Sequence, residues 1–322
     1  MMRLALILGA MLGWGSCAVA LAAPDASARS LLQSMSQAVR SLSYTGTLVY
    51  QRADILASLV FSHDVKNGVE EARLRRLSGT AEERSRIGDQ MLHSFPGPDV
   101  MRSGHPIPGA IAINSRRFFE APYEFLMGER ARVADRATQI VDVRARDEHR
   151  HSYRFWIDEE TSLLLKSQTL GPSQQVLEQY EFSDLKFQIP AVSVESDQPM
   201  QLRIHPVQAP DAVIQFSPAS WLPQGYELVS ALPSRAAGQS IYTLVYSDGL
   251  GSFSIFLELI GQVSQSQIQA VLGPTIAVGR DYALEGGSLR VTLVGEIPVA
   301  TGMTIIDALD VEGLKALLKR SS

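Results

Sequence analysis

The feature that most constrains the fold is a change of hydrophobic periodicity at Tyr44. Between Ser27 and Leu42, apolar residues recur every three or four positions, which is the spacing of one amphipathic helix. From Tyr44 onward, apolar and polar residues alternate, which is the pattern of a strand with one buried face. This alternation returns in short segments along most of the chain. The sequence therefore predicts an α+β fold that is mainly antiparallel β.

Turn residues separate the alternating segments, so consecutive hairpins are expected. Asn67-Gly68 is one such turn, because this pair tolerates positive φ. Residues 96–109 are rich in Pro and Gly and predict a long loop, and Phe118–Leu126 predicts a short helix. The strands predicted in this half of the chain are Tyr44–Gln51, Leu56–His63, Val69–Leu77, Glu83–Ile87, Gln90–Phe95, Thr138–Arg146, Ser152–Ile157, Leu163–Thr169 and Val176–Phe187.

A cluster of prolines marks a boundary between two domains. Pro190, Pro199, Pro206 and Pro210 interrupt any regular element, and no aromatic residue occurs in this stretch. We therefore expect an N-terminal domain over residues 23–189, a linker over 190–212 and a small C-terminal domain over 213–322. The elements predicted in the second domain are strands at Val213–Phe216, Leu228–Ala231, Tyr242–Tyr246, Ser252–Leu259 and Leu289–Val294, and one helix that follows Pro298 and runs through Thr304 to Leu318.

Residues 1–22 have the three parts of a secretory signal peptide. Arg3 is basic, Leu4–Leu12 is apolar, and Ala20-Leu21-Ala22 supplies the small residues of a cleavage site. The single Cys17 lies inside this segment, so the exported chain is expected to carry no thiol. The alternative, a lipidated Cys17, is disfavoured by Trp14, which stands where lipoprotein signals prefer Leu.

The charge pattern argues against nucleic-acid binding. Of the 29 basic residues 24 are Arg, and 15 of these lie between Arg73 and Arg154, yet the net charge is −5 because acidic residues are interleaved with them. The ordinary interpretation is a solvated sheet face of mixed charge. A second interpretation stays open, in which some of these Arg side chains bind anionic lipid or a carboxylate-rich partner segment.

No motif predicts catalysis, a cofactor or a metal ion. A Gly-x-Ser-x-Gly elbow, a dinucleotide fingerprint and a phosphate loop are all missing from the sequence. Asp147, His149 and His151 are close together, but they do not form a tight metal-ligand motif, and we expect them to be surface polar residues. The sequence predicts a binding protein and not an enzyme.

A set of bulky apolar side chains suggests a lipid site. Most such residues in a curved sheet form ordinary core, but a gap between the sheet, a helix and the Pro-rich loop would suit an acyl chain or a hydrophobic peptide. The candidate lipid-binding residues are Leu48, Tyr50, Leu59, Phe61, Phe118, Phe125, Leu126 and Phe155.

Six segments, in order along the chain, carry a resemblance that begins at the first predicted strand and continues through both predicted domains. They are Tyr44-Thr45-Gly46-Thr47-Leu48-Val49-Tyr50-Gln51, Tyr153-Arg154-Phe155-Trp156-Ile157-Asp158 with Thr161–Lys166, Val176-Leu177-Glu178-Gln179-Tyr180, Trp221-Leu222-Pro223-Gln224-Gly225-Tyr226, Leu244-Val245-Tyr246-Ser247-Asp248-Gly249-Leu250, and Val291–Pro298. In this order and spacing, the segments resemble the MucB/RseB family of periplasmic sigma-factor regulators.

The resemblance implies an N-terminal domain like the lipoprotein carriers LolA and LolB, an incomplete barrel with helices in its concavity, followed by a small C-terminal α+β domain. It implies a periplasmic protein that binds the periplasmic region of a membrane anti-sigma factor and shields it from the site-1 protease. Lipid or lipopolysaccharide would relieve the shielding. A periplasmic lipid or lipoprotein carrier is the alternative, and association with a second copy of the chain stays open. The second strand, Ile55–Phe61, and the 96–109 loop depart from the family pattern, so they are weak guides to a lipid site.

The turn after the strand Tyr242–Tyr246 is the candidate partner site. Its ordinary interpretation is a strand end and a turn, since Asp-Gly is a common turn pair. The functional interpretation is that the turn presents apolar side chains beside an exposed strand edge, to which a flexible anti-sigma segment could add. The candidate residues are Tyr246, Ser247, Asp248, Gly249 and Leu250.

Overall fold

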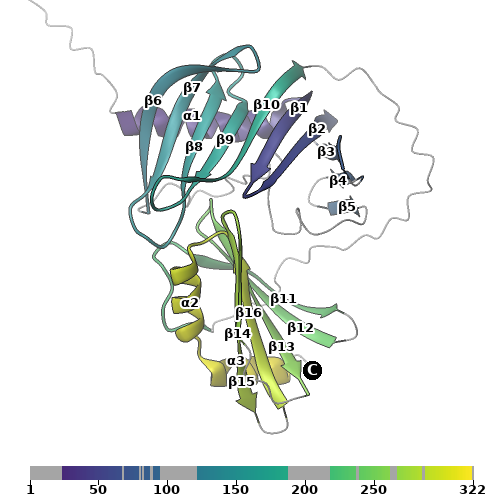
Figure 1. The fold of residues 1–322 in the computed structure, drawn as a ribbon, viewed down its shortest axis with the longest axis vertical. Coiled ribbons are helices and arrows are strands. Elements are labelled where there is room, and N and C mark those ends of the chain that lie inside the picture. Colours follow the sequence, from purple (N-terminus) through teal and green to yellow (C-terminus); the bar gives the residue numbers. More distant parts are fainter. Residues whose placement is uncertain are drawn as a thin grey trace, which may run out of the picture.

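Two antiparallel sheets make up the frame of the protein, one above the other in Figure 1. The structure is a computed structural model, and it describes residues 24–320 apart from 67–68, 80, 82, 88–89, 95–121, 188–217, 237–238, 262–266 and 285–286. Each sheet has its own cluster of buried apolar residues. The predicted leader, the Asn67-Gly68 turn, the 96–109 loop, the linker and the strand at 213–216 lie outside the described residues.

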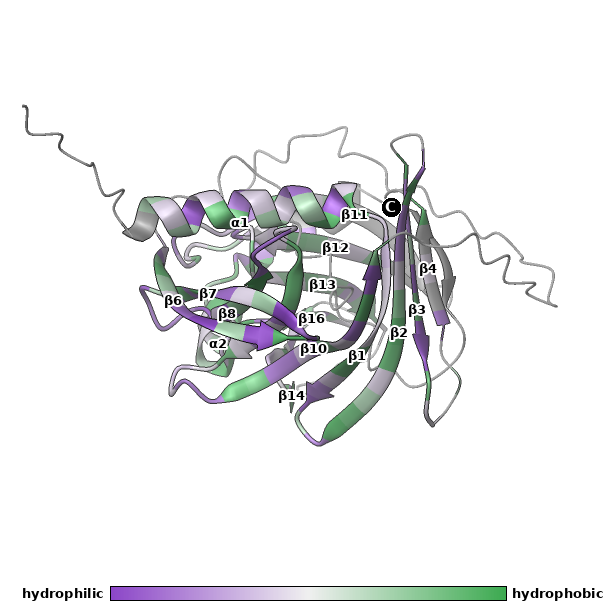
Figure 2. Cartoon of the chain, turned by 90° about the horizontal axis from the view of Figure 1, so that it is seen from above, coloured by the Kyte–Doolittle hydropathy of each residue, from purple (hydrophilic) through white to green (hydrophobic). Residues whose placement is uncertain are grey.

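The N-terminal sheet has ten described strands in the order β5-β4-β3-β2-β1-β10-β9-β8-β7-β6. Its two end strands do not pair with each other among the described residues, so the sheet is curved but open (Figure 2). The strands are β1 (Tyr44–Arg52), β2 (Ile55–Lys66), β3 (Val69–Arg76), β4 (Glu83–Ile87), β5 (Gln90–Ser94), β6 (Tyr123–Val133), β7 (Arg136–Ala145), β8 (Ser152–Asp158), β9 (Leu164–Leu170) and β10 (Val176–Phe187).

One long helix, α1 (Pro24–Ser41), lies across this sheet (Figure 2). Its buried residues Ala28, Leu32, Met35 and Val39 are three or four positions apart, so they form one stripe that faces the strands. Gln33, Ser34 and Gln37, which lie between them, are exposed. The helical periodicity predicted from the sequence is therefore confirmed.

Gly46 of β1 lies where the chain comes closest to β10. A side chain at this position would bring its Cβ within 2.4 Å of the Asp184 carbonyl oxygen and within 2.8 Å of the Phe182 ring. The register between β1 and β10 shifts just afterwards, between Thr47 and Leu48. This close approach explains why glycine occupies the centre of the Tyr-Thr-Gly-Thr segment.

The C-terminal sheet has the order β11-β12-β13-β16-β15-β14. Two helices, α2 (Val299–Asp307) and α3 (Val311–Arg320), follow the last strand, and α2 packs on β15 and β16. Figure 1 shows α2 alongside these strands. The strands are β11 (Glu227–Ala236), β12 (Gln239–Ser247), β13 (Ser252–Ile260), β14 (Gln267–Leu272), β15 (Thr275–Leu284) and β16 (Gly287–Gly295).

Two predictions about elements are wrong. The helix expected at Phe118–Leu126 is absent from the described part of that range, because Tyr123 begins strand β6. The single terminal helix is two helices that meet at Asp310, whose carboxylate accepts a hydrogen bond from the Gly313 N–H at 3.1 Å and starts α3. The mainly antiparallel α+β class is confirmed.

Candidate functional site

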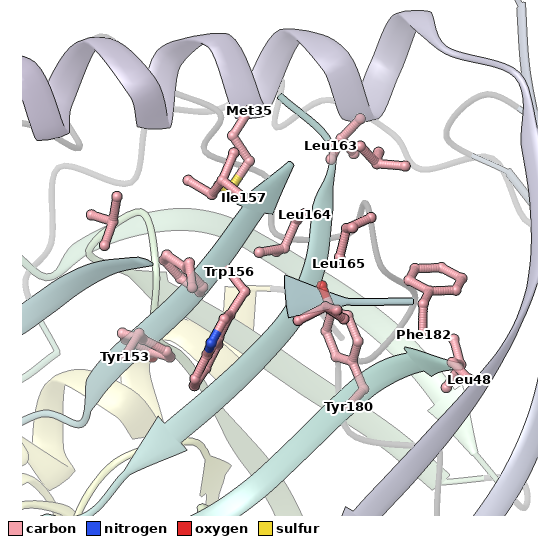
Figure 3. Packing of buried hydrophobic residues seen from close by; sticks show 14 of the residues in the cluster. Met35, Leu48, Tyr153, Trp156, Ile157, Leu163, Leu164, Leu165, Tyr180 and Phe182 are labelled. Atoms are coloured by element: carbon pink, nitrogen blue, oxygen red, sulfur yellow. The ribbon is translucent and has the colours of Figure 1, made fainter. Parts of the chain in front are cut away.

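The interior between α1 and the N-terminal sheet contains most of the predicted lipid-binding residues. Leu48, Tyr50, Leu59, Phe61, Phe125 and Phe155 all belong to one buried cluster, together with the apolar stripe of α1. Figure 3 shows Met35 pointing from α1 toward Ile157 of β8, so the helix fills the space above the sheet. In this arrangement these side chains form core, and α1 covers them.

The two candidate lipid-binding residues on β6, Phe125 and Leu126, face opposite sides of the sheet. Phe125 is buried, and its ring lies 4.7 Å from the guanidinium carbon of Arg29 on α1. Leu126 is only half-buried, because neighbouring residues of a strand face opposite sides of the sheet. Leu126 therefore does not line the interior with Phe125, which corrects the helical expectation for this stretch. Phe118 lies outside the described residues.

Two polar groups of the N-terminal domain are buried at the end of the sheet that faces the C-terminal domain. Tyr50 donates a hydrogen bond to Glu178, and burial, followed by the charge of Glu178, raises the pKa of the Tyr50 hydroxyl. Arg52 is almost completely buried and contacts the C-terminal domain. Tyr50 therefore lies at the border of the apolar interior, and Arg52, two residues later, lies in the junction between the domains.

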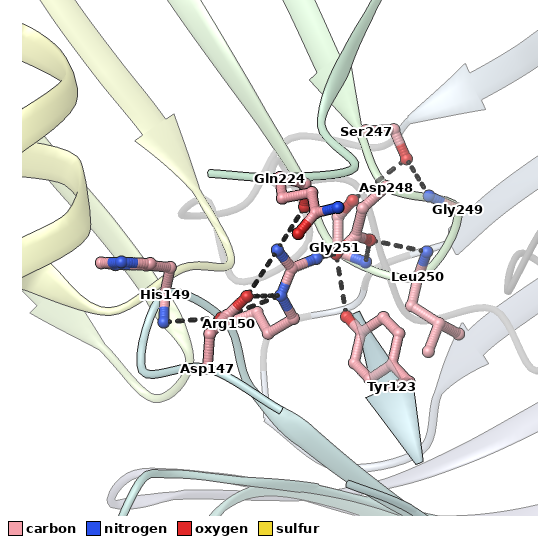
Figure 4. Close-up of polar contacts among 10 residues, drawn as sticks. All are labelled: Tyr123, Asp147, His149, Arg150, Gln224, Ser247, Asp248, Gly249, Leu250 and Gly251. Carbon is pink, nitrogen blue, oxygen red and sulfur yellow. Dashed lines mark hydrogen bonds and ion pairs between the residues drawn. The ribbon is translucent and has the colours of Figure 1, made fainter. Parts of the chain in front are cut away.

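Arg150 is at the centre of this junction (Figure 4). Its side chain, in the turn between β7 and β8, is 0% exposed and forms an ion pair of 2.5 Å with Asp248 of the C-terminal domain. It also donates to the Asp147 carboxylate at 3.0 Å and to the Gln224 carbonyl oxygen at 2.6 Å. Burial lowers the pKa of the Arg150 guanidinium. The hydrogen bond to Asp147 and the neighbouring negative charges raise this pKa by more than burial lowers it, so the guanidinium stays charged.

Asp248 shapes its own turn and joins the domains. One carboxylate oxygen accepts the Leu250 and Gly251 N–H groups at 3.0 and 2.8 Å. The other accepts the Tyr123 hydroxyl at 2.9 Å as well as the Arg150 guanidinium. Leu250, at the tip of this turn, belongs to the hydrophobic cluster of the N-terminal domain. This turn of the C-terminal domain therefore inserts Leu250 into the apolar cluster of the N-terminal domain.

A second contact joins the domains at the turn between β14 and β15. Arg52 donates to the Leu272 carbonyl oxygen at 3.1 Å and to the Thr275 hydroxyl. A ring nitrogen of His151 lies 3.1 Å from the Pro274 carbonyl oxygen. Gly273, with φ of +56°, packs so closely that an added Cβ would lie 2.7 Å from Cγ of Arg52.

The junction corrects two expectations about exposure. The predicted partner turn is not exposed, because Tyr246, Asp248 and Leu250 are buried, and β12 lies between β11 and β13 and not at a sheet edge. Ser247 and Gly249 are half-buried. His151 is also buried, although it was expected at the surface. Whether the residues 246–250 touch a partner stays a prediction.

Buried acid-base groups are concentrated at the same junction. Burial raises the pKa of Glu296, which follows β16, to about 7, although the charge of Arg52 lowers it. Burial, followed by the charges of Glu296 and Asp248, raises the pKa of Tyr153 well above its usual range. Within the described part of the chain, the Tyr153 and Tyr226 hydroxyls have no hydrogen-bond partner. These groups were not singled out from the sequence, since no local pattern brings Tyr153 to Glu296.

No metal or membrane feature accompanies these contacts. In residues 24–320, leaving aside the gaps, no group of three or more His, Cys, Asp or Glu side chains is arranged to hold a metal ion. None of the helices described there is both long and apolar enough to cross a membrane.

Comparison with protein families covers both sheets. Residues 27–213 match the MucB/RseB N-terminal domain, and residues 213–310 match the MucB/RseB C-terminal domain. The chain belongs to the MucB/RseB family. The resemblance seen in the sequence is thereby confirmed over almost the whole described chain.

Individual MucB/RseB relatives match over nearly their full length. The sigma factor AlgU regulatory protein MucB of Pseudomonas aeruginosa is 28% identical over 296 residues, which is 89% of this chain and 92% of the relative. The sigma-E factor regulatory protein RseB of Salmonella typhimurium is 29% identical over 304 residues, with the same coverage of 89% and 92%. Both names describe regulators of sigma factors.

Solved structures agree with these matches. The complex of Pseudomonas aeruginosa MucA and MucB is similar with a TM-score of 0.68 and 25% identity, over 87% of this chain and 96% of that one. MucB in complex with the periplasmic part of MucA gives a TM-score of 0.68 and 26% identity, over 86% and 96%. These MucB/RseB relatives have therefore been solved with a bound polypeptide partner.

Proposed function

We propose that this protein is a non-enzymatic periplasmic regulator that binds the periplasmic region of a membrane anti-sigma factor and shields it from the site-1 protease. The observation that carries the proposal is the match of both MucB/RseB domains in the order and spacing of relatives that are sigma-factor regulators. The predicted leader supports export to the periplasm.

The junction supports a role in which the two domains act as one binding body. The buried Arg150–Asp248 ion pair and the insertion of Leu250 into the N-terminal apolar cluster fix the position of one domain relative to the other. Buried ion pairs cost desolvation free energy unless their geometry is good, so they favour one arrangement over others. A flexible partner segment that contacts both domains would be ordered on binding, and a protease that needs an extended chain would lose access to it.

The proposal includes lipid, or the acyl chains of lipopolysaccharide, as the signal that relieves shielding. An acyl chain that enters between α1 and the sheet must replace the buried side chains Leu32, Met35 and Val39. Removing three such side chains from the interior costs roughly 1.5–3 kcal/mol each, and ten buried methylenes return about 8 kcal/mol. The two terms are of similar size. A lipid would therefore compete with α1 and shift its position without unfolding the domain.

Binding is tested with the purified periplasmic region of a MucA-type anti-sigma factor from the same organism, titrated by calorimetry against the exported chain. Saturable binding of one segment per chain is expected. An untargeted pull-down from periplasm gives an independent check, and recovery of lipoproteins without any anti-sigma factor would contradict the proposal.

The lipid step is tested separately with two adjacent variants. Phe125→Asp places a charge in the interior and should abolish the effect of added fatty acid on partner binding, whereas Leu126→Asp, on the opposite face of β6, should leave that effect unchanged. Circular dichroism verifies that both variants fold. An equal lipid response in both would show that lipid acts elsewhere.

The alternative function is a periplasmic carrier of lipid or lipoprotein, and the observation that favours it is the large apolar cluster between α1 and the N-terminal sheet. A carrier needs only that domain. The second, separately packed C-terminal sheet favours the regulator. The two functions are distinguished by transfer of a labelled lipoprotein between vesicles, which only a carrier accelerates.

A further inference from the structure

The C-terminal sheet has one face covered by helices and one face without them. Side chains of Ile276, Val278 and Leu293 are buried on the covered face, where Gly302 of α2 packs against them. On the opposite face, Ala277, Thr292 and Val294 are half-buried, and no described helix packs there. We call this opposite side the open face.

Two uncharged rows run across the open face. In an antiparallel sheet, directly paired residues point to the same side. The pairing registers therefore place all members of each row side by side across five strands. One row is Ile268, Gly279, Thr292, Phe256 and Thr243, and the other is Ala270, Ala277, Val294, Ser254 and Val245.

A charged row borders this uncharged surface. Arg290 of β16 pairs with Asp281 through two hydrogen bonds of 2.9 and 3.0 Å, and Glu258 is directly opposite Arg290 on β13. This charged row bounds the uncharged surface on one side. An uncharged surface with a charged border is typical of a contact site.

Strand β14 ends the rows at an open sheet edge. It pairs with β15 alone among the described strands, and its residues Gln267–Val271 are all exposed. The strand contains no charged residue and no proline, which are the usual means of protecting an edge from further pairing. The other edge of this sheet, β11, contains Glu227, Pro233 and Arg235.

We propose that β14 and the open face receive an extended segment of the anti-sigma factor. The segment adds to β14 as a further strand and places uncharged side chains, at every second position, beside Ile268 and Ala270. The inference rests on the proposed function and specifies its contact surface. It differs from the predicted 246–250 turn, where Tyr246, Asp248 and Leu250 are buried, because the β14 edge is accessible.

Three observations favour a flexible polypeptide segment as the occupant. The edge offers backbone groups, which a lipid cannot pair with along a strand. Its six residues span about 20 Å, which is the length of one extended segment of about six residues. A flexible segment can cover the open face as well as the edge. The turn after β14 is also held by Arg52, so an added strand lies next to the domain junction.

The test uses two double variants of equal charge on the same strand. Ile268→Lys with Ala270→Lys places two charges on the open face, and Gln267→Lys with Gln269→Lys places them on the helix-covered side. We expect the first pair to weaken binding of the purified MucA-type periplasmic region at least tenfold and the second less than threefold. Hydrogen exchange should show slowed exchange at residues 267–272 when the partner binds.

Each outcome has one meaning. Equal affinities for the two double variants, or unchanged exchange over residues 267–272, would overturn the β14 site while the proposed function stands. Failure of the unmodified chain to bind the periplasmic region would reject the proposed function itself. Sedimentation would show whether the unmodified chain forms a dimer. If it does, and if the open-face variant alone abolishes the dimer while it still binds the partner, the edge belongs to a second copy of the chain and this inference is overturned.

Discussion

Replacing Asp248 by Asn tests whether the buried pair at the junction holds the two domains together. The Asn oxygen can still accept the Leu250 and Gly251 N–H groups that shape the turn. The Asn amide nitrogen, however, is a donor that faces another donor, the Arg150 guanidinium, while it can still donate to the Tyr123 hydroxyl oxygen. The substitution therefore removes the ion pair between the domains while it keeps the turn.

The expected loss follows from the surroundings of Arg150. Breaking a buried ion pair by removing one partner costs about 3–5 kcal/mol, because the remaining charge is left in a poorly solvated site. Arg150 is 0% exposed but keeps its ion pair with Asp147 at 3.0 Å, so we expect a loss near the lower end, about 3 kcal/mol. Arg150→Met removes the charge and retains most of the volume.

Urea unfolding at pH 7, followed by circular dichroism, gives the free energy of unfolding for both single variants and the double variant. The two changes should be non-additive, with a coupling free energy of at least about 1.5 kcal/mol, as for residues in direct contact. Asp135→Asn is the matched control, since Asp135 forms an exposed ion pair with Arg132 and its loss should have no measurable effect. A loss below about 1 kcal/mol for Asp248→Asn, or simple additivity, would refute this account of the junction.

Three further variants extend the account. Folding raises the pKa of Glu296 from 4.5 to about 7, so the folded state binds a proton more tightly than the unfolded state. The contribution of this proton to the free energy of unfolding is complete below pH 4.5 and is lost as the pH rises through 7. Glu296→Gln should therefore stabilise the protein by up to about 3 kcal/mol at pH 8 and have little effect at pH 4.5, in thermal unfolding at both values; equal effects would contradict the burial of this carboxyl. Leu32→Ala should lower the free energy of unfolding by about 2–5 kcal/mol and strengthen binding of a fluorescent fatty acid, because less buried surface must be displaced, whereas Gln33→Ala should change neither. Gly273→Ala combines a positive φ with a contact of 2.7 Å to Arg52, so it should lower the unfolding midpoint in urea, and an unchanged midpoint would show that this turn can relax.

The local elements followed from hydrophobic periodicity, with errors where burial differs from the usual pattern. Alternation located β1, β2 and β10 within a few residues, because one face of each is buried and the other is not. The aromatic cluster around Phe125 suggested a helix, but alternating burial along β6 supports the sheet instead. Strand β14 was missed because its polar–apolar alternation covers only Gln267–Ala270, a run too short to stand out.

The junction could not be predicted from the sequence. Arg150 and Asp248 are 98 residues apart, and each lies in a turn whose local pattern only indicates a solvated loop. The contact arises because the ends of two sheets meet, which is a property of the tertiary fold. The candidate lipid-binding residues share one apolar cluster as predicted, apart from Leu126 and the undescribed Phe118, but the sequence did not reveal that α1 fills the space above them.

The central claim is that binding of this protein protects an anti-sigma factor from cleavage. The most direct measurement is the rate at which purified site-1 protease cuts the periplasmic region of a MucA-type anti-sigma factor, with and without a saturating amount of the exported chain. We expect the chain to slow cleavage at least tenfold, and added fatty acid to restore the rate for the unmodified chain but not for Phe125→Asp. Cleavage at the same rate in the presence of the bound chain would contradict the claim.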